Sequence, residues 1–260
     1  MVKESGLQAT GVPAQASRGS RPQWLRFVLP LLVLSLLIGM VGTVGYRYLS
    51  EEIRRETHRT LAVIAEQKRQ QIEVALNATR IDAGLYFSRH SQLEMLFGQW
   101  LDGGRRNGPI LERMQFLMAE LVRVRGWSGL AVLDGEGKPC LVVGEADFRN
   151  HAEQVRNILK QPRIELVDLH RDSHGQVIYG ILAPIGGAGG TPRGVAYLTW
   201  RADRALYPLV ESWPVPTRTA ETYLVRRDGE GVRFLTPLRH RHDAALTLTR
   251  PLDTPNLPAA

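Results

Sequence analysis

The chain has 260 residues, which is enough for one or two domains, and 43% of them are hydrophobic, a share that excludes a wholly disordered chain. Its single cysteine, Cys140, excludes an intramolecular disulfide framework, a cysteine-rich zinc site and an iron–sulfur cluster held by cysteines alone. The net charge is +7, but the basic residues are scattered and form no block, so we expect no nucleic-acid partner.

The N-terminal region combines a polar tail with an apolar run of membrane length. Residues 1–22 are small and polar without apolar periodicity, which predicts a flexible cytoplasmic tail. Residues 27–46 carry no charge, and about 20 helical residues at 1.5 Å each span a hydrocarbon core of roughly 30 Å. With Trp24 and Tyr46 as interfacial aromatics, we predict a transmembrane helix over 23–48. The alternative is a cleaved signal peptide, whose apolar region is usually about 7–15 residues and ends in a small-residue cleavage site.

The residue pattern over 49–90 predicts one long signalling helix, with Ser50 as its possible N-cap. No proline interrupts this stretch, and apolar residues such as Leu61, Ile64 and Ala65 recur at three- and four-residue steps. A stripe of this length needs a partner surface, which is either the chain's own domain or a second copy of the chain. We expect a homodimer that pairs through this helix.

The region 91–213 predicts an α+β domain. Five short apolar strands are separated by turns, and one amphipathic helix follows the second strand. This order, joined by hairpins, is that of a PAS-like antiparallel sheet with one face packed on the long helix. The predicted elements are helices at 91–101 and 110–124, strands at 129–133 and 139–143, a helix at 151–160, and strands at 164–169, 176–185 and 194–200.

The last part of the chain predicts a second, smaller β unit. A helix over 204–213 leads out of the first domain, and strands are expected at 221–226, 232–235 and 245–252. Three strands make a thin core. We therefore expect 214–260 to be the start of a second PAS-like unit that is incomplete.

Three stretches resemble bacterial Cache-type sensor domains: LAVIAEQKRQQIEVALNATRIDAGLYF at 61–87, VDLHR at 167–171, and WPVPTRTAETYLVRRDGEGVRFLTPLRHRHDAALTL at 213–248. The resemblance implies a double Cache architecture with a membrane-distal and a membrane-proximal unit, in the periplasmic half of a receptor of the bacterial inner membrane. It also implies a cytoplasmic transmitter, either a histidine kinase or a cyclic-di-GMP enzyme. The sequence holds no kinase histidine box and no GGDEF string, so we assign no catalysis to this chain and expect a sensor, not an enzyme.

A small-molecule pocket is expected in the distal unit, between the sheet and the helix at 151–160. We predict Tyr179 and Tyr197 as its walls and Arg163 as its fixed charge, which would suit an anionic ligand because a guanidinium binds a carboxylate in a bidentate manner. The further candidate ligand-binding residues are Trp127, Trp200, His170 and Asp168. The alternatives are that the aromatics form core and that Asp168 and His170 belong to a charged turn.

We expect no metal or cofactor. His240 and His242 would share a strand face, but a metal needs three or four ligands, and Arg239 and Arg241 would repel a cation. The glycine-rich loop at 186–190 lacks the Gly-Lys-Ser/Thr of a phosphate loop. Besides a sensor, the sequence leaves open a structural or dimerisation ectodomain that binds no ligand. A membrane-anchored hydrolase is disfavoured because the sequence shows no catalytic triad.

Overall fold

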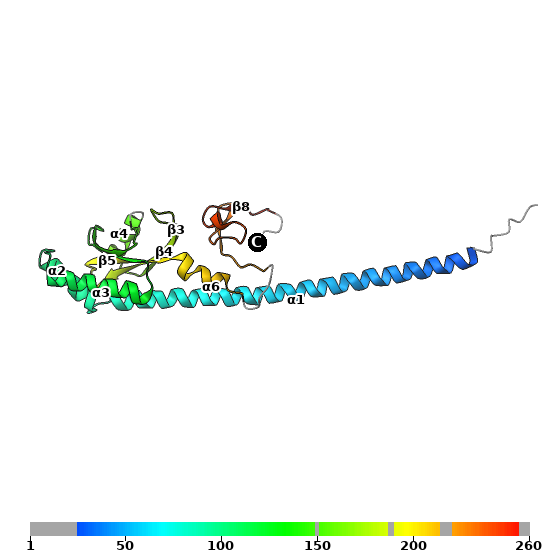
Figure 1. The fold of residues 1–260 in the computed structure, drawn as a ribbon, viewed down its shortest axis with the longest axis horizontal. Coiled ribbons are helices and arrows are strands. Elements are labelled where there is room, and N and C mark those ends of the chain that lie inside the picture. The colour runs from blue at the N-terminus through cyan, green and yellow to red at the C-terminus, as the bar shows by residue number, and fades with distance from the viewer. Residues whose placement is uncertain (1–24, 149–150, 187–189, 214–219, 255–260) are drawn as a thin grey trace, which may run out of the picture. The chain divides into compact units, whose positions relative to one another are not determined.

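The computed structural model describes residues 25–148, 151–186, 190–213 and 220–254. The fold is α+β, as predicted: a long N-terminal helix, a five-stranded antiparallel sheet and a smaller three-stranded sheet (Figure 1). Residues 1–62 and 63–260 form two compact units. The tail predicted over 1–22 lies outside the described residues.

Helix α1 (Leu25–Phe87) is continuous, so the prediction of two helices with Ser50 as a cap is wrong. Residues 46–83 contain no glycine or proline, and one serine does not end a helix whose neighbours are good helix formers. Within the described residues, α1 is the one helix long and apolar enough, by length and composition, to cross a membrane. Its most apolar window has a mean hydropathy of 2.3 and none of it is buried.

The C-terminal turns of α1 pack on the chain's own core. Ala83 and Phe87 are fully buried there, and Ile72 and Leu76 pack against the same cluster. Lys68 is also buried, and its ammonium donates to the Leu209 carbonyl at 2.7 Å. Part of the predicted apolar stripe therefore finds its partner surface within the same chain.

Helices α2 (Gln92–Asp102) and α3 (Pro109–Arg125) follow, and each bound lies within one residue of the predicted one. The Ser91 hydroxyl accepts a hydrogen bond from the Glu94 amide, which caps α2. Gly126 ends α3 with φ of 66°, a left-handed conformation that glycine adopts without strain.

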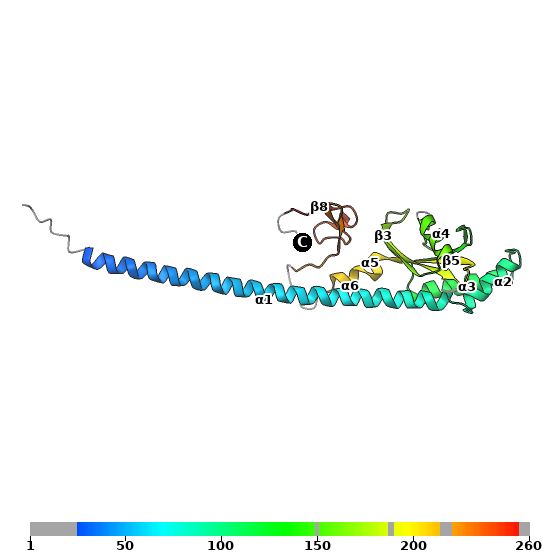
Figure 2. The same cartoon turned by 180° about the vertical axis from the view of Figure 1, so that it is seen from behind.

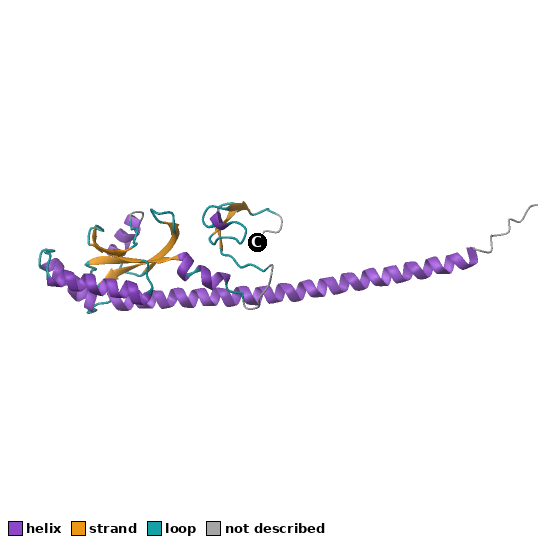
Figure 3. Ribbon diagram, viewed as in Figure 1, coloured by secondary structure: helices purple, strands orange, loops and turns teal. Residues whose placement is uncertain are grey.

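The five-stranded sheet has the order β2-β1-β5-β4-β3, and every neighbouring pair is antiparallel. Figure 3 shows its strands in orange. The chain order β-β-α-β-β-β that the sequence predicts is confirmed. The elements are β1 (Gly129–Asp134), β2 (Pro139–Gly144), α4 (Ala152–Lys160), β3 (Glu165–Arg171), β4 (Val177–Ile185) and β5 (Gly194–Arg201).

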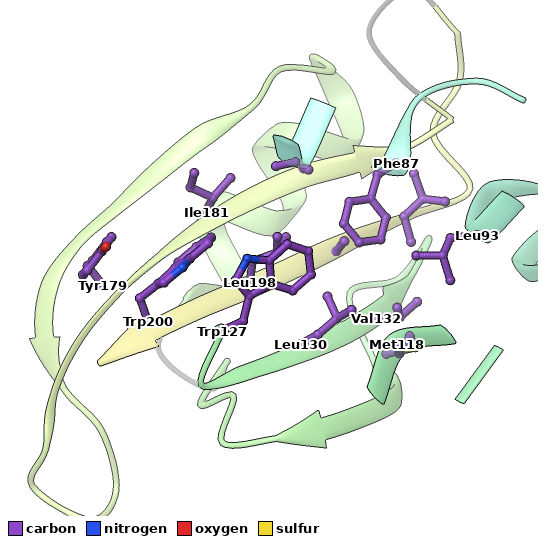
Figure 4. Packing of buried hydrophobic residues seen from close by; sticks show 14 of the residues in the cluster. Phe87, Leu93, Met118, Trp127, Leu130, Val132, Tyr179, Ile181, Leu198 and Trp200 are labelled. Carbon is purple, nitrogen blue, oxygen red and sulfur yellow. The ribbon is translucent and has the colours of Figure 1, made fainter. Parts of the chain in front are cut away.

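The two faces of this sheet carry separate cores, because side chains alternate along each strand. The first face, which packs against α1, α2 and α3, includes Leu130, Ile181 and Leu198 (Figure 4). The second face is covered by α4 (Figure 2). Its core includes Leu182 and Tyr197. Both faces are thus covered by helix, and the central strands β4 and β5 are buried almost throughout.

The C-terminal unit is a three-stranded sheet in the order β6-β7-β8, formed by β6 (Val225–Asp228), β7 (Gly231–Phe234) and β8 (Thr249–Pro251). Two short helices, α5 (Ala202–Ala205) and α6 (Tyr207–Glu211), replace the single helix predicted before it. The strand predicted at 245–252 is shorter, since Ala244 and Leu248 instead join Phe234 in a small core.

Candidate functional site

A bulge in β3 turns His170 towards α4. The pairing of β3 with β4 changes register between Val167 and His170. Val167 packs in the α4-side core, and His170 approaches Tyr197 on the same side. In a regular strand, residues three apart point to opposite faces, so the irregularity is what brings both side chains to one face.

His151 and His170 face each other between α4 and β3. Their Nε2 atoms are 3.2 Å apart, and their rings meet edge to face with centroids 4.7 Å apart. His151, at the N-cap position of α4, is buried, and its Nδ1 lies 2.8 Å from Gln154 Oε1. His170 Nδ1 lies 2.8 Å from the Asp168 carbonyl oxygen, which only accepts, so this nitrogen carries a hydrogen. In the neutral pair His170 Nε2 is therefore the acceptor and His151 Nε2 the donor, and the contact of His151 Nδ1 with Gln154 Oε1 becomes a hydrogen bond when this nitrogen is protonated.

Tyr197 is the third member of this cluster and contacts both histidines. It is fully buried, its hydroxyl lies 3.5 Å from His170 Nε2, and its ring centroid lies 5.4 Å from that of His151. Gly180 on β4 leaves room for it: a Cβ there would stand 2.5 Å from the tyrosine ring and 2.6 Å from the Leu198 carbonyl oxygen. Burial raises the pKa of the Tyr197 phenol, so its hydroxyl stays protonated at physiological pH.

Burial lowers the pKa of His151 below its usual value of 6.5, and the nearby His170 lowers it further. The hydrogen bond with Gln154 and the charge of Asp147 act in the opposite direction. The net effect favours the neutral imidazole of His151 at neutral pH. Protonation of this ring therefore costs desolvation free energy, which the Gln154 hydrogen bond and the Asp147 charge partly offset.

A cleft of about 330 Å³ opens on the sheet near the β3–β4 turn. Asp147 accepts a hydrogen bond from the Ser173 amide at 3.0 Å, and Asp172 accepts from the His174 amide at 2.9 Å. The lining thus combines carboxylates, among them that of Asp172, which is only 4% exposed, with apolar side chains. Its lining residues are Val142, Gly144, Glu145, Ala146, Asp147, Phe148, Asp172, Ser173 and His174.

Three of the predicted aromatic residues are core on the opposite side. Tyr179 stacks on Trp200 with ring centroids 5.6 Å apart, and Trp127 meets Trp200 edge to face at 5.9 Å (Figure 4). These rings belong to the core that faces α1, whereas Tyr197 belongs to the α4-side core. Tyr179 and Tyr197 therefore cannot wall one pocket, because they lie on opposite faces of the sheet.

The space between α4 and the sheet, where the sequence predicts a pocket, is filled by side chains. Val155 and Ile158 of α4 pack there on Leu182 and Tyr197, and all four are buried. The pocket cannot lie at this position because the amphipathic helix presents its whole apolar face to the sheet.

The predicted charged residues pair within the chain. The Arg163 guanidinium donates to the Glu165 carboxylate at 2.9 and 3.2 Å, and its side chain is 52% exposed. It does not line the cleft. Asp168 forms an ion pair with Arg226 of β6, and Arg171 donates to the Ala245 carbonyl at 2.8 Å. Side chains of β3 thus connect the five-stranded sheet to the three-stranded sheet.

Sequence reasoning missed His151 and Asp147. A signal for His151 is present: it stands four and seven residues before Val155 and Ile158, which places it on the apolar face of the helix. Asp147 lies in the segment between β2 and α4, where no periodicity marks it.

The described residues contain no group of three or more histidine, cysteine, aspartate or glutamate side chains placed to hold a metal ion. His240 and His242, which the sequence placed on one strand face, lie instead in the turn before β8 and are exposed. The glycine-rich loop at 186–190 lies partly outside the described residues.

No protein-family model and no curated protein matches the chain. Several solved structures do match. The ligand-binding domain of the amino-acid chemoreceptor PctC of Pseudomonas aeruginosa, solved with GABA, is 16% identical over 59% of this chain and 64% of that one, with a TM-score of 0.42. That of the Campylobacter jejuni chemoreceptor Tlp3, solved with 4-methylisoleucine, is 11% identical over 57% and 61%, with a TM-score of 0.42.

The sensor domain of the Vibrio cholerae histidine kinase DctB is 12% identical over 56% of this chain and 58% of that one, with a TM-score of 0.37. The chain spans about three fifths of the length of these solved domains. These three solved structures, all at low sequence identity, are sensor or ligand-binding domains of a histidine kinase and of chemoreceptors.

Proposed function

We propose that this chain is the sensing region of a receptor of the bacterial inner membrane, that its described residues cross this membrane once, through α1, and that residues 63–260 lie in the periplasm. The proposal rests on the continuity of α1. One uninterrupted helix holds an exposed apolar run long enough to cross a bilayer and, at its other end, the core residues Ala83 and Phe87. A change in the packing of the five-stranded domain would therefore act directly on the helix that leads to the membrane. The receiver would be a histidine kinase or a cyclic-di-GMP transmitter.

The cleft beside the β3–β4 turn is the ligand site that the geometry favours. Its lining includes Glu145, Asp147 and Asp172, so it would attract a small molecule with an amino group, and its apolar side chains would contact an aliphatic or aromatic body. The anionic ligand that Arg163 suggested is disfavoured at this position because the described residues of the lining include no arginine or lysine.

We expect an amine-bearing compound, screened alongside amino acids and carboxylates, to raise the thermal stability of the chain in lipid nanodiscs. A ligand at 100 times its dissociation constant adds about 2.7 kcal/mol. Asp147→Asn should remove most of this stabilisation, and Arg163→Gln, the matched control outside the cleft, should keep it. A carboxylate whose effect depends on Arg163 would contradict the cleft assignment. If no compound stabilises the chain, the alternative of a structural ectodomain without a ligand is favoured.

The same receptor would be a homodimer that pairs through α1. Opposite its buried face, α1 exposes Val74 (69%), Ile81 (70%) and Leu85 (65%) at seven- and four-residue spacing. This is the spacing of residues that face a second helix. Lys68, three residues after Ala65 of the predicted stripe, faces the chain's own domain instead, where it is buried against Leu209.

We expect single cysteines at Val74, Ile81 and Leu85, in a Cys140→Ser background, to form crosslinked dimers when a membrane-impermeant bis-maleimide is added to cells with a permeabilised outer membrane. Cysteines at Glu73 and Arg80, exposed on the flank of the same helix, should crosslink weakly. Equal crosslinking at all five positions would contradict pairing through this stripe, and its absence until the inner membrane is opened would contradict the periplasmic location.

A further inference from the structure

The cluster of His151, His170 and Tyr197 has a role that ligand binding in the cleft does not explain. Two buried or half-buried imidazoles share one hydrogen bond between Nε2 atoms, and this bond joins α4 to β3. We propose that the His151–His170 pair is a proton-operated latch that holds α4 on the sheet when at least one ring is neutral and releases it when both are protonated.

The hydrogen-bond pattern dictates which proton opens the latch. His151 can take a proton at Nδ1 without losing the pair, since this nitrogen then donates to Gln154 Oε1 at 2.8 Å. His170 already carries a hydrogen on Nδ1, so its additional proton goes to Nε2. Two N–H groups then face each other across 3.2 Å, and two positive rings stand in contact; the Tyr197 hydroxyl, 3.5 Å from His170 Nε2, can accept from His170 but does not restore the bond between the rings. The bond is lost and the like charges repel.

The groups around the pair make protonation attainable despite burial. Asp147 lies in the segment between β2 and α4, and its charge favours protonated His151. On β3, Glu165 accepts a hydrogen bond from Gln154, and Asp168, whose carbonyl oxygen holds His170, pairs with Arg226 of β6. From β5 only the neutral Tyr197 hydroxyl approaches the rings. Asp172 and His174 belong to the neighbouring β3–β4 turn.

The release of α4 would be transmitted to the second sheet through β3. The strand that carries His170 also carries Asp168 and Arg171, whose side chains contact Arg226 and the Ala245 carbonyl of the second sheet. Release of α4 therefore removes a support from the strand that joins the two sheets. The inference does not depend on whether the cleft binds a ligand.

Hydrogen exchange of the full chain in nanodiscs tests the latch at pH 7.5 and pH 5.0, on either side of the ordinary histidine pKa of about 6.5. After correction for the intrinsic pH dependence, amides of α4 should lose at least tenfold protection at pH 5.0, while those of β4 and β5 keep theirs. His170→Gln replaces the titrating acceptor with an amide and should hold α4 protection within about twofold. The control His174→Gln, at an exposed histidine in the next turn, should respond as the unaltered chain does.

Two results would overturn the proposal: unchanged α4 protection in the unaltered chain, or the same loss in His170→Gln as in the unaltered chain. If the β4 and β5 amides of His170→Gln are unprotected at pH 7.5, the variant is misfolded. The ring resonances of the unaltered chain, followed as a function of pH, then test the latch instead. The latch requires the α4 amides to lose protection over the same pH range in which the ring resonances of His151 change to those of the protonated ring. Loss of α4 protection without a change in these resonances would reject it.

Discussion

Trp200→Ala should lower the free energy of unfolding of the five-stranded domain by about 3–5 kcal/mol. The indole is 6% exposed and sits between Tyr179, on which it stacks, and Trp127, which it meets edge to face. Its removal leaves a cavity that the rigid strands β4 and β5 cannot close, and both ring contacts are lost. A whole domain is stable by only about 5–15 kcal/mol, so this single change would bring the domain close to its unfolding threshold.

Pulse proteolysis of the full chain in nanodiscs, across a urea series, measures this effect without relying on tryptophan fluorescence. Phe116→Ala on α3 is the matched control, because that ring is 64% exposed and its loss should change stability by less than about 0.5 kcal/mol. A Trp200→Ala chain as stable as the control would indicate that the indole lines a pocket instead of filling core. The result therefore decides between the two interpretations that the sequence left open for these aromatics.

Local signals in the sequence predicted the elements of the first domain well. Alternation, turn residues and caps are properties of neighbouring residues, and Ser91, Gly126 and the Asp134–Gly137 turn each set a boundary in this way. The same signals misplaced the start of the long helix, because Ser50 has the chemistry of a cap but is followed and preceded by residues that continue the helix. A cap residue ends a helix only when its neighbours do not extend it.

The candidate site was predicted less well than the fold. The expected pocket depended on which face each aromatic takes, and Tyr179 and Tyr197 fall on opposite faces because of the register of β4 on β5. The position of His170 depends on a bulge, which adds one residue to the strand and reverses the side on which later residues lie. Register shifts are long-range properties of strand pairs, so no local sequence pattern around Asp168 or His170 indicates them.

Two turns with the same sequence, Asp-Gly-Glu-Gly, allow the effect of burial on a capping carboxylate to be measured within one chain. Asp134 starts the β1–β2 turn, and its Oδ1 accepts hydrogen bonds from the Glu136 and Lys138 amides, both at 2.9 Å. Its side chain is 3% exposed and pairs with Arg105 at 2.9 Å. Asp228 starts the β6–β7 turn with a side chain that is 42% exposed. The first carboxylate should therefore stabilise the chain far more than the second.

Asp134→Ala should destabilise the five-stranded domain by about 3 kcal/mol, since it leaves two turn amides without their charged acceptor. Asp228→Ala should cost less than about 1 kcal/mol. Burial alone would raise the pKa of Asp134, but the Lys138 and Glu136 amides and Arg105 outweigh it and lower the pKa below 3.8. The stabilisation is thus fully present above pH 3.8 and is lost as the pH falls through the lowered pKa. Urea-dependent pulse proteolysis should show the gap between the unaltered chain and Asp134→Ala constant from pH 7 to pH 5 and narrowing below pH 4. Equal losses in the two alanine variants, or a gap that does not change with acid, would contradict the assignment of this stability to the buried carboxylate.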